Sequence, residues 1–262
     1  MKKFSIGAAL SACAISGCLM TSNVAAQDAS QLYVGGALTF SEVTVTPGGF
    51  NTVGFFSNAV GSQSQDANGI SINLGLDNLY QFGNGIRLRG ELEFNRSELD
   101  GCGGSPLCTA VGGGSANPNL ITGSFPGPPG PFAFFYRAEV ETYNGFANVF
   151  LDFDLPVFDA PLGVFVGGGV GFSVHDVTVS DAVVRGSNSD TEFAWHAGGG
   201  VKYAITDSVE IFAAGRYMDL GTSDTPLVSV VGAAPGGNYT LEHTVIEGRV
   251  GLNVKLGALF GN

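Results

Sequence analysis

The stretch that decides the fold is LGVFVGGGVGFSV, which runs from Leu162 to Val174. Three consecutive glycines suggest a loop that cradles a phosphate, but such a loop needs a strand before the glycines and a helix after them. The segment that follows, FSVHDVTV, is β-branched and alternating, and no Lys-Ser or Lys-Thr pair accompanies the glycines. The pattern therefore argues against a nucleotide site.

The parity of the residue numbers explains this stretch better. The even positions are apolar except for Gly168, whereas the odd positions, apart from Phe165, are glycines followed by Ser173 and His175. Successive side chains of a β-strand point to opposite faces. The stretch therefore predicts one long strand with an apolar face and a face of small or polar residues.

The N-terminus has the features of a secretory signal. Two lysines at positions 2 and 3 precede an apolar segment over 4–20, and small residues at 24–26 form a cleavage site. We expect residues 1–26 to be removed, leaving a mature domain over 27–262. The segment Ile15–Cys18 also resembles a bacterial lipobox, so lipidation of Cys18 remains an alternative.

Composition and charge narrow the functional classes. The chain has 262 residues, 41 of them glycine, and a formal net charge of -12. Removal of Lys2 and Lys3 brings this to -14. Such a chain repels phosphates, so we expect no nucleic-acid partner. No segment after the signal approaches the ~20 apolar residues of a membrane helix.

Eight alternating segments follow one another along the mature chain. We expect strands at about 31–42, 69–82, 86–98, a segment ending near 153, 162–174, 191–206, 208–220 and 240–257. The connections after the second, fourth and sixth strands are short, whereas the others are longer and rich in Gly, Pro, Ser, Asn and Asp. This pattern is typical of an outer-membrane barrel. The sequence thus predicts an all-β fold, a single eight-stranded antiparallel transmembrane β-barrel with short periplasmic turns and long extracellular loops.

The polar faces of these strands carry charges of both signs. Six of the nine lysines and arginines of the mature chain lie on them. A soluble barrel with a ligand cavity would instead turn its apolar face inward. Because membrane proteins keep ionisable groups away from lipid, we expect these charges to pair inside a narrow lumen. The predicted network comprises Arg87, Arg89, Glu91, Glu93, Lys202, Glu210, Arg216, Glu247, Arg249 and Lys255, with Asp77 and Asp152 on the same face.

Aromatic residues on the apolar faces lie near the strand ends. Interfacial girdles of this kind flank the apolar band of outer-membrane barrels. The predicted girdle consists of Tyr80 and Tyr203 at the short-turn end and Phe193, Trp195 and Tyr217 at the long-loop end.

The last strand carries the most specific resemblance. Its sequence, RVGLNVKL over 249–256, resembles the insertion signal of small outer-membrane β-barrels of Gram-negative bacteria, the family of outer-membrane protein A barrels and porin-like surface antigens of alphaproteobacteria. The chain departs from that family at its end, where Phe260 is followed by Gly261 and Asn262. The resemblance implies a multi-pass location in the cell outer membrane, contact with outer-membrane lipid, and recognition of the C-terminal strand by the barrel-assembly machinery.

These features favour a non-enzymatic barrel with structural and surface-interaction roles, whose loops are available to host or surface ligands. A narrow ion or small-solute pore is the alternative. A lipid-modifying enzyme would need a nucleophile and a base, for which Ser173 with His175, or His243 with Glu247, are candidates on the inward face. We expect no catalytic site and no cofactor.

Two residue pairs complete the predictions. Cys102 and Cys108 enclose a turn-rich segment, CGGSPLC, and in an exported protein we expect them to form a disulfide. If the loop after the fifth strand centres between Arg185 and Gly186, His175 and His196 become cross-strand neighbours and candidates for a weak metal site or a pH-sensitive latch.

Overall fold

The computed structural model describes residues 31–50, 63–83, 85–98, 125–127, 130–132, 137–155, 161–180, 184–226, 228–229 and 238–257. The predicted signal peptide and the Cys102–Cys108 pair lie outside these residues. No helix in the described part of the chain is long and apolar enough to cross a membrane.

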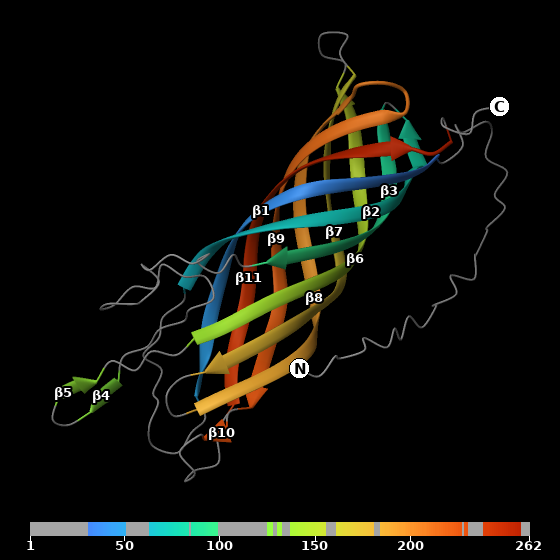
Figure 1. The fold of residues 1–262 in the computed structure, drawn as a ribbon. Helices are drawn as coiled ribbons and strands as arrows, with labels where there is room; N and C mark the ends of the chain where they lie inside the picture. Colours follow the sequence, from blue (N-terminus) through green and yellow to red (C-terminus); the bar gives the residue numbers. More distant parts are fainter. Residues whose placement is uncertain are drawn as a thin grey trace, which may run out of the picture.

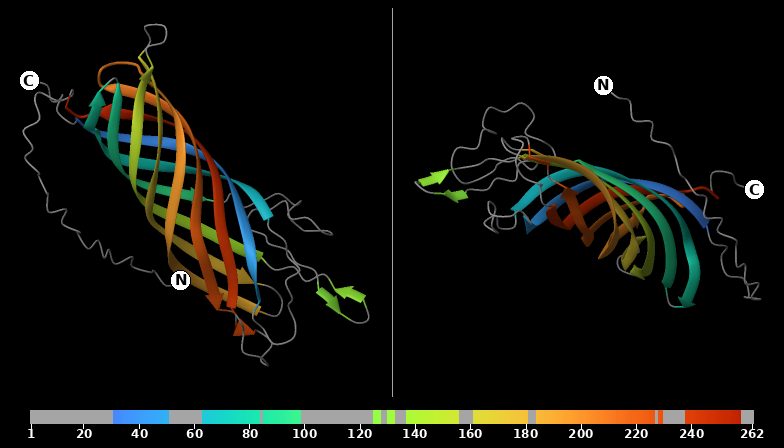
Figure 2. Two further views of the ribbon diagram at one scale, coloured as in Figure 1. Left: turned by 180° about the vertical axis from the view of Figure 1, so that it is seen from behind. Right: turned by 90° about the horizontal axis from the view of Figure 1, so that it is seen from below.

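Eight long antiparallel strands close into a ring, so the predicted fold class is confirmed (Figures 1 and 2). The ring closes because β1 pairs with both β2 and β11, and β8 pairs with β9. In order around the barrel, the strands are β1 (Gln31–Phe50), β2 (Gln63–Gly83), β3 (Ile86–Glu98), β6 (Arg137–Leu155), β7 (Leu162–Ser180), β8 (Val184–Ala204), β9 (Val209–Pro226) and β11 (Asn238–Lys255).

Three short strands lie outside this ring. β4 (Phe125–Gly127) and β5 (Gly130–Phe132) form a separate hairpin, and β10 (Val228–Ser229) pairs with the first residues of β8. All three belong to the long-loop end of the barrel, opposite the turns that join β2 to β3, β6 to β7 and β8 to β9 (Figure 1).

The glycines of β7 allow the neighbouring strands and their side chains to pack closely. A Cβ atom on Gly171 would lie 1.8 Å from the carbonyl oxygen of Gly145 on β6. A Cβ atom on Gly167 would lie 2.5 Å from the ring of Phe150, and one on Gly169 would lie 2.0 Å from the side-chain oxygen of Asn148. The glycine-rich stretch is therefore a packing feature of the barrel wall.

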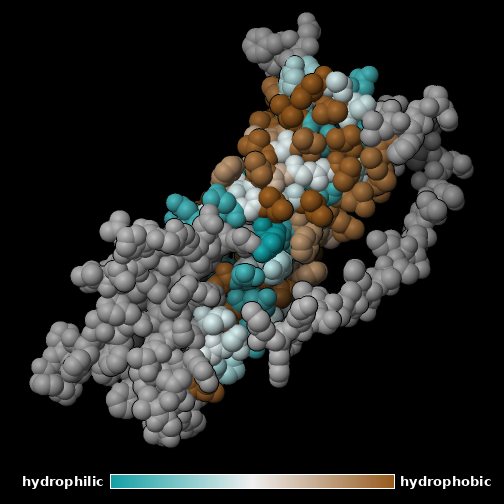
Figure 3. Space-filling model, viewed as in Figure 1, coloured by the Kyte–Doolittle hydropathy of each residue, from teal (hydrophilic) through white to brown (hydrophobic). Residues whose placement is uncertain are grey.

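An apolar belt covers the outside of the barrel towards its short-turn end (Figure 3). Outward residues such as Leu38, Ile72 and Val250 are more than half exposed, although they are large and aliphatic. In an outer-membrane barrel such a belt faces lipid. We call this part the membrane tier.

Beyond the belt, towards the long loops, the residue types on the two faces of the sheet change. The outward positions become polar, as at Glu42, Asp176 and Glu242, which are exposed. The inward positions carry buried aliphatic residues beside uncharged polar ones such as Thr142, Ser223 and His243. The apolar residues form an outer core of Val43, Ala67, Val140, Val177, Met218, Leu220, Leu241 and Val245. This part, the outer tier, is built like a water-soluble barrel.

The outer tier explains why most strands are longer than their apolar alternation indicates. β1 extends to Phe50 instead of about 42, β7 to Ser180 instead of 174, and β8 begins at Val184 instead of about 191. The apolar alternation predicts that each strand ends at its last outward apolar residue. The backbone ladder continues for several residues because the inward residues of the outer tier form their own core.

Candidate functional site: the barrel lumen

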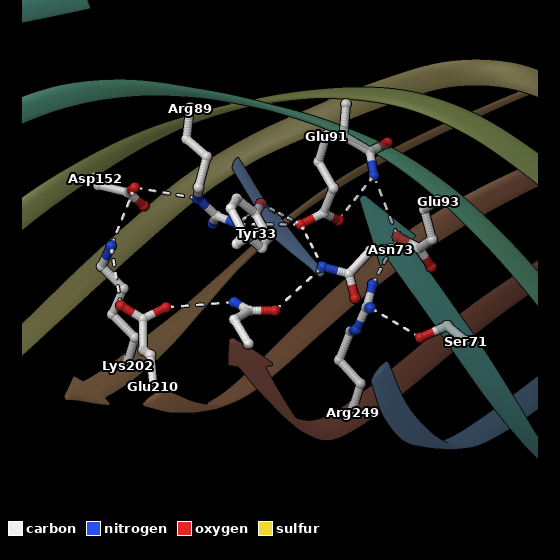
Figure 4. Close-up of polar contacts among 12 residues, drawn as sticks. Tyr33, Ser71, Asn73, Arg89, Glu91, Glu93, Asp152, Lys202, Glu210 and Arg249 are labelled. Carbon is white, nitrogen blue, oxygen red and sulfur yellow. Dashed lines mark hydrogen bonds and ion pairs between the residues drawn. The ribbon is translucent and has the colours of Figure 1, made fainter. Parts of the chain in front are cut away.

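The lumen of the membrane tier holds a series of ion pairs that runs from the short-turn end towards the long loops. Near the short-turn end, the Asp152 carboxylate accepts from Arg89 Nε at 3.1 Å and from Lys202 Nζ at 3.1 Å (Figure 4). Lys202 Nζ also lies 3.5 Å from Glu210. At the mouth, Lys255 pairs with Asp77 and Arg87 pairs with Asp154. Arg87, Asp154 and Lys255 line a vestibule of about 530 Å³ that opens at this end.

The middle of the lumen is organised around Arg89 and Glu91. Tyr33 donates its hydroxyl proton to Glu91 at 2.7 Å and accepts from Arg89 Nη1 at 2.9 Å. Asn73 donates to the same Glu91 oxygen at 3.0 Å. The Arg89 guanidinium also lies 4.4 Å from the centre of the Phe150 ring, a cation–π distance. Three neighbouring strands, β1, β2 and β3, thus supply one compact polar cluster.

The part of the network nearest the long loops centres on Glu93. Its carboxylate accepts from Arg216 at 2.9 Å and from Arg249 at 2.8 Å, on the opposite wall. Arg216 Nε also donates to Glu247 at 2.8 Å. The side chains of Glu93 and Glu247 are 0% and 1% exposed, so these pairs are buried in the lumen.

All ten residues of the predicted lumen network lie on the inward face. Ion pairs and hydrogen bonds through Asp152 and Asn148 link eight of them, whereas Arg87 pairs separately with Asp154 and Lys255 with Asp77. The pairs join six cations to seven carboxylates, so the network is nearly neutral although the chain carries a charge of -12. Its members come from β2, β3, β6, β8, β9 and β11. Charge balance inside the lumen places the acidic excess of the protein elsewhere.

The sequence analysis did not identify Tyr33, Asn73 and Asn148 as members of this site. Asn148 donates to Glu93 at 3.2 Å, and Asn73 links Glu91 to Asn253. The parity rule alone would have found them, because all three occupy inward positions. Because these three residues carry no formal charge, the pattern of charged residues does not identify them.

Little free space remains between these side chains. The lumen contains a cavity of about 30 Å³, bordered by Arg89, Phe165, His196 and Phe212 among others. A cavity of this size has room for about two water molecules. Among the described residues, no group of three His, Cys, Asp or Glu side chains could hold a metal ion.

The predicted neighbour pair His175–His196 is wrong. The register places His175 opposite Asp190 and His196 opposite Gly169, because β7 and β8 are joined by a much shorter loop than expected. His196 lies in the membrane tier, where Nε2 is 2.8 Å from the side-chain oxygen of Asn148. His175 lies in the outer tier and stacks on His243, with 4.1 Å between ring centres.

The other predicted residues lie as follows. The aromatic residues Tyr80, Phe193, Trp195, Tyr203 and Tyr217 are all on the outer surface and 39–65% exposed. Ser173 is fully buried and its hydroxyl has no hydrogen-bond partner in the described structure, so it does not contact His175. Of the second candidate pair for catalysis, His243 bonds to Ser223 and Glu247 to Arg216.

A closed ring of eight strands, apolar outside and charged inside, defines an integral outer-membrane β-barrel. The chain belongs to the family described as outer membrane protein beta-barrel domain, whose profile matches residues 11–253. Its location is accordingly the cell outer membrane. No curated protein matches the sequence significantly.

Several solved structures of outer-membrane proteins are similar to this chain at low sequence identity. Neisserial surface protein A is 16% identical, with 86% of this chain and 96% of that chain covered and a TM-score of 0.45. OprG from Pseudomonas aeruginosa is 9% identical, with 86% and 97% covered and a TM-score of 0.45. The Escherichia coli outer membrane protease OmpT is also 9% identical, with 89% and 99% covered and a TM-score of 0.49. None of these likenesses is close enough to transfer an activity.

Proposed function

We propose that this protein is a closed, non-enzymatic outer-membrane barrel that holds its long loops above the bilayer for surface interactions. The single observation that carries the proposal is the filled interior. Ion pairs occupy the lumen of the membrane tier, and the outer core occupies the lumen above it. An eight-stranded barrel is just wide enough for its own side chains.

The two fillings would obstruct ions in different ways. A hydrated ion entering from the vestibule would have to separate buried pairs such as Glu93–Arg216, which leaves an unpaired charge at a cost of several kcal/mol. Further out it would meet Leu241 and Met218, which are 0% and 2% exposed and offer no polar group. These barriers favour a plugged lumen over a narrow pore.

The outer tier would act as a stalk. In β7, the eight residues 173–180 continue the ladder beyond the belt, which corresponds to a height of about 20 Å for a tilted strand. Its outward carboxylates include Glu42, Asp66, Glu141, Asp176 and Glu242. Loops carried on such a stalk would stand clear of the lipid headgroups and be available to host or surface ligands.

Biogenesis is part of the same proposal. Residues 1–26 would direct export and be removed, and the last strand, with RVGLNVKL over 249–256, would be recognised by the barrel-assembly machinery. Cys102 and Cys108 would form their disulfide in the longest loop after export.

A planar-bilayer recording at pH 7.5 tests the closed lumen. The wild-type protein should give no discrete conductance steps. A variant with Glu93→Ala and Leu241→Ala, which weakens both fillings, should give them and so serves as the positive control. Steps of similar size in the wild-type protein would favour the narrow pore instead. In a parallel assay with lipid substrates, acyl hydrolysis or transfer that is lost on Ser173→Ala would contradict the non-enzymatic role.

A further inference from the structure

One junction of the barrel wall is not closed by backbone pairing along its whole length. The ladder between β8 and β9 runs from Ala204↔Glu210 to Trp195↔Asp219. Beyond Trp195, residues 186–194 of β8 pair only with β7, and residues 222–226 of β9 pair only with β11, within the described ranges. At the outer end, β10 pairs with Val184 and Arg185 of β8. We call this outer part of the β8–β9 junction the seam.

Side chains bridge the seam where the ladder ends. Asn188 Nδ2 donates to the carbonyl oxygen of Asp224 at 2.7 Å, and the Asp190 carboxylate accepts from the backbone N–H of Asp224 at 2.8 Å. A third bridge comes from β7, where His175 Nε2 lies 2.8 Å from the carbonyl oxygen of Leu220. The imidazole N–H donates in this contact, so His175 ties β9 to the strand beyond β8.

The backbone of β9 changes course beside these bridges. Gly221 has a φ of 82°, and a bulge there shifts the register against β11 between Glu242 and Thr244. The bulge exposes the Leu220 carbonyl to the interior, where His175 can reach it. It also leaves His243 of β11 opposite the irregularity, without a regular partner on β9.

The two histidine rings form a buried stack at this point. Their centres are 4.1 Å apart and their planes are inclined by 12°. His243 Nε2 is 2.9 Å from the hydroxyl of Ser223, and His175 Nδ1 is 3.4 Å from that of Thr142. The residues are 2% and 0% exposed. Nearly parallel rings do not direct their nitrogens to a common point, so the stack is unsuited to binding a metal ion.

The charged groups around the stack lie mainly on other faces. On the inward face at this level β8 supplies Asp190 and Glu192, which are half-buried. The other strands supply neutral inward residues, namely Val43 of β1, Thr142 of β6, Val177 of β7, Ser223 of β9, and Leu241 and Val245 of β11. The carboxylates of Glu42, Glu141, Asp176, Asp219, Asp224 and Glu242 belong to the outward face.

We propose that the seam is an acid-operated opening: protonation of His175 and His243 separates their rings, releases His175 from the Leu220 carbonyl and gives water access to the outer lumen. Protonation alone does not break the hydrogen bond from His175 to Leu220, because an imidazolium N–H still donates. The mutual repulsion of two buried imidazolium rings stacked at 4.1 Å is what would move His175 away. With His175 displaced, the links left across the seam would be Asn188, Asp190 and, at its outer end, the short pairing of β10 with β8. This goes beyond the closed barrel proposed above by adding a state that opens with pH.

The direction of the pH effect follows from burial. Both rings lie outside the membrane tier. Desolvation lowers the pKa of His175, although the Leu220 carbonyl and the carboxylates of Asp190 and Asp176 act in the opposite direction. Desolvation lowers the pKa of His243 well below its usual range, with the His175 charge as a further cause. In an open seam both would titrate near ~6.5. The open state thus binds more protons, so the closed state is favoured above about pH 6.5 and loses that advantage below it. Two protons change the equilibrium by up to about 100-fold per pH unit.

Hydrogen–deuterium exchange of the full-length protein in lipid nanodiscs tests the opening. After correction for intrinsic exchange, the amides of residues 220–225 should exchange at least about tenfold faster at pH 5 than at pH 7.5. His243→Gln keeps a hydrogen-bonding group for Ser223 but cannot be protonated, and it should abolish the acid response. The matched control is His196→Gln, which removes the one histidine of the chain that is not part of the stack and should leave the response unchanged.

Two outcomes would overturn the proposal. An acid response that survives in His243→Gln but disappears in Asp190→Asn would assign the effect to the carboxylate bridge. Equal protection of the amides of residues 220–225 at both pH values in the wild type would exclude an opening. Amides in β2 and β3 report whether each variant is folded, since this hairpin lies away from the seam. Conductance at pH 7.5 is a separate measurement, so failure of the closed-barrel proposal is recognised independently.

Discussion

At the scale of single residues, the lumen depends on carboxylates that serve more than one cation. Glu93 binds Arg216 and Arg249, and Asp152 binds Arg89 and Lys202. A buried ion pair adds little net stability compared with apolar packing, but removal of one member leaves an uncompensated charge. Shared carboxylates increase that effect, because their loss leaves two buried cations.

We predict that Glu93→Gln lowers the free energy of unfolding by about 3–5 kcal/mol. The amide keeps the size of the side chain but removes the charge that Arg216 and Arg249 share. Urea unfolding from lipid vesicles can be followed through the fluorescence of Trp195, the only tryptophan of the chain. The matched control is Glu42→Gln on the exposed face of β1, which should change stability by less than about 0.5 kcal/mol. Equal effects of the two variants would mean that the lumen is hydrated enough to screen its charges.

At the scale of the strand, β7 shows why an inward glycine differs from an outward one. The inward Gly171 faces the Gly145 carbonyl at a distance that leaves no room for a methyl group. The outward Gly248 of β11 has no neighbour closer than the Phe40 carbonyl, at 3.8 Å from a Cβ placed there. Of these two glycines, only Gly171 lies where the neighbouring strand excludes a side chain.

Gly171→Ala should therefore destabilise the barrel by about 1–3 kcal/mol or more, since the backbone of β6 must move to admit the methyl group. Gly248→Ala should be neutral or slightly stabilising, because alanine restricts the unfolded chain and meets no clash. Paired urea titrations in the same lipid measure both. The steric explanation fails if Gly248→Ala is the more damaging of the two.

The strands also show how far the sequence was informative. Where one face contacts lipid, as from Leu162 to Val174, alternation located the strand and its inward side correctly. The segment SNSDTE over 187–192 is polar on both faces, so periodicity could not distinguish it from a loop, yet it is part of β8. That one misassignment moved the centre of the hairpin by three residues, and it produced the incorrect pairing of His175 with His196.

The candidate site divides in the same way. The ten lumen charges follow from parity, because each lies on a strand whose apolar face was recognised. The His175–His243 stack joins β7 to β11, which are not neighbours in the ring. Its formation depends on the bulge at Gly221 and on the curvature of the closed barrel. Neither is contained in the pattern of a single strand.

At the scale of the whole molecule, one closed sheet contains two tiers with opposite polarity. The membrane tier is apolar outside and holds the charged network inside. The outer tier is polar outside, and its interior combines aliphatic residues with uncharged hydroxyl and imidazole groups. In β1 the inward residues change from polar to apolar without any change of parity, since Thr39 and Ser41 are followed by Val43. The solvent on each side, lipid or water, determines which residue type the same geometry requires.

Closure of the ring leads to the last prediction. Every ring strand has two neighbours, so no continuous free edge exists in the membrane tier through which detergent could unravel the sheet. Unheated protein in cold detergent should migrate differently from a boiled sample on a gel. The shift should persist after reduction, because a Cys102–Cys108 loop of this length contributes only about 2 kcal/mol and both residues lie outside the ring strands. Mass spectrometry of the exported protein should show no free thiol at these positions. Identical migration of the two samples would contradict a closed barrel, whereas loss of the shift only under reducing conditions would assign the disulfide a structural role much larger than its loop length implies.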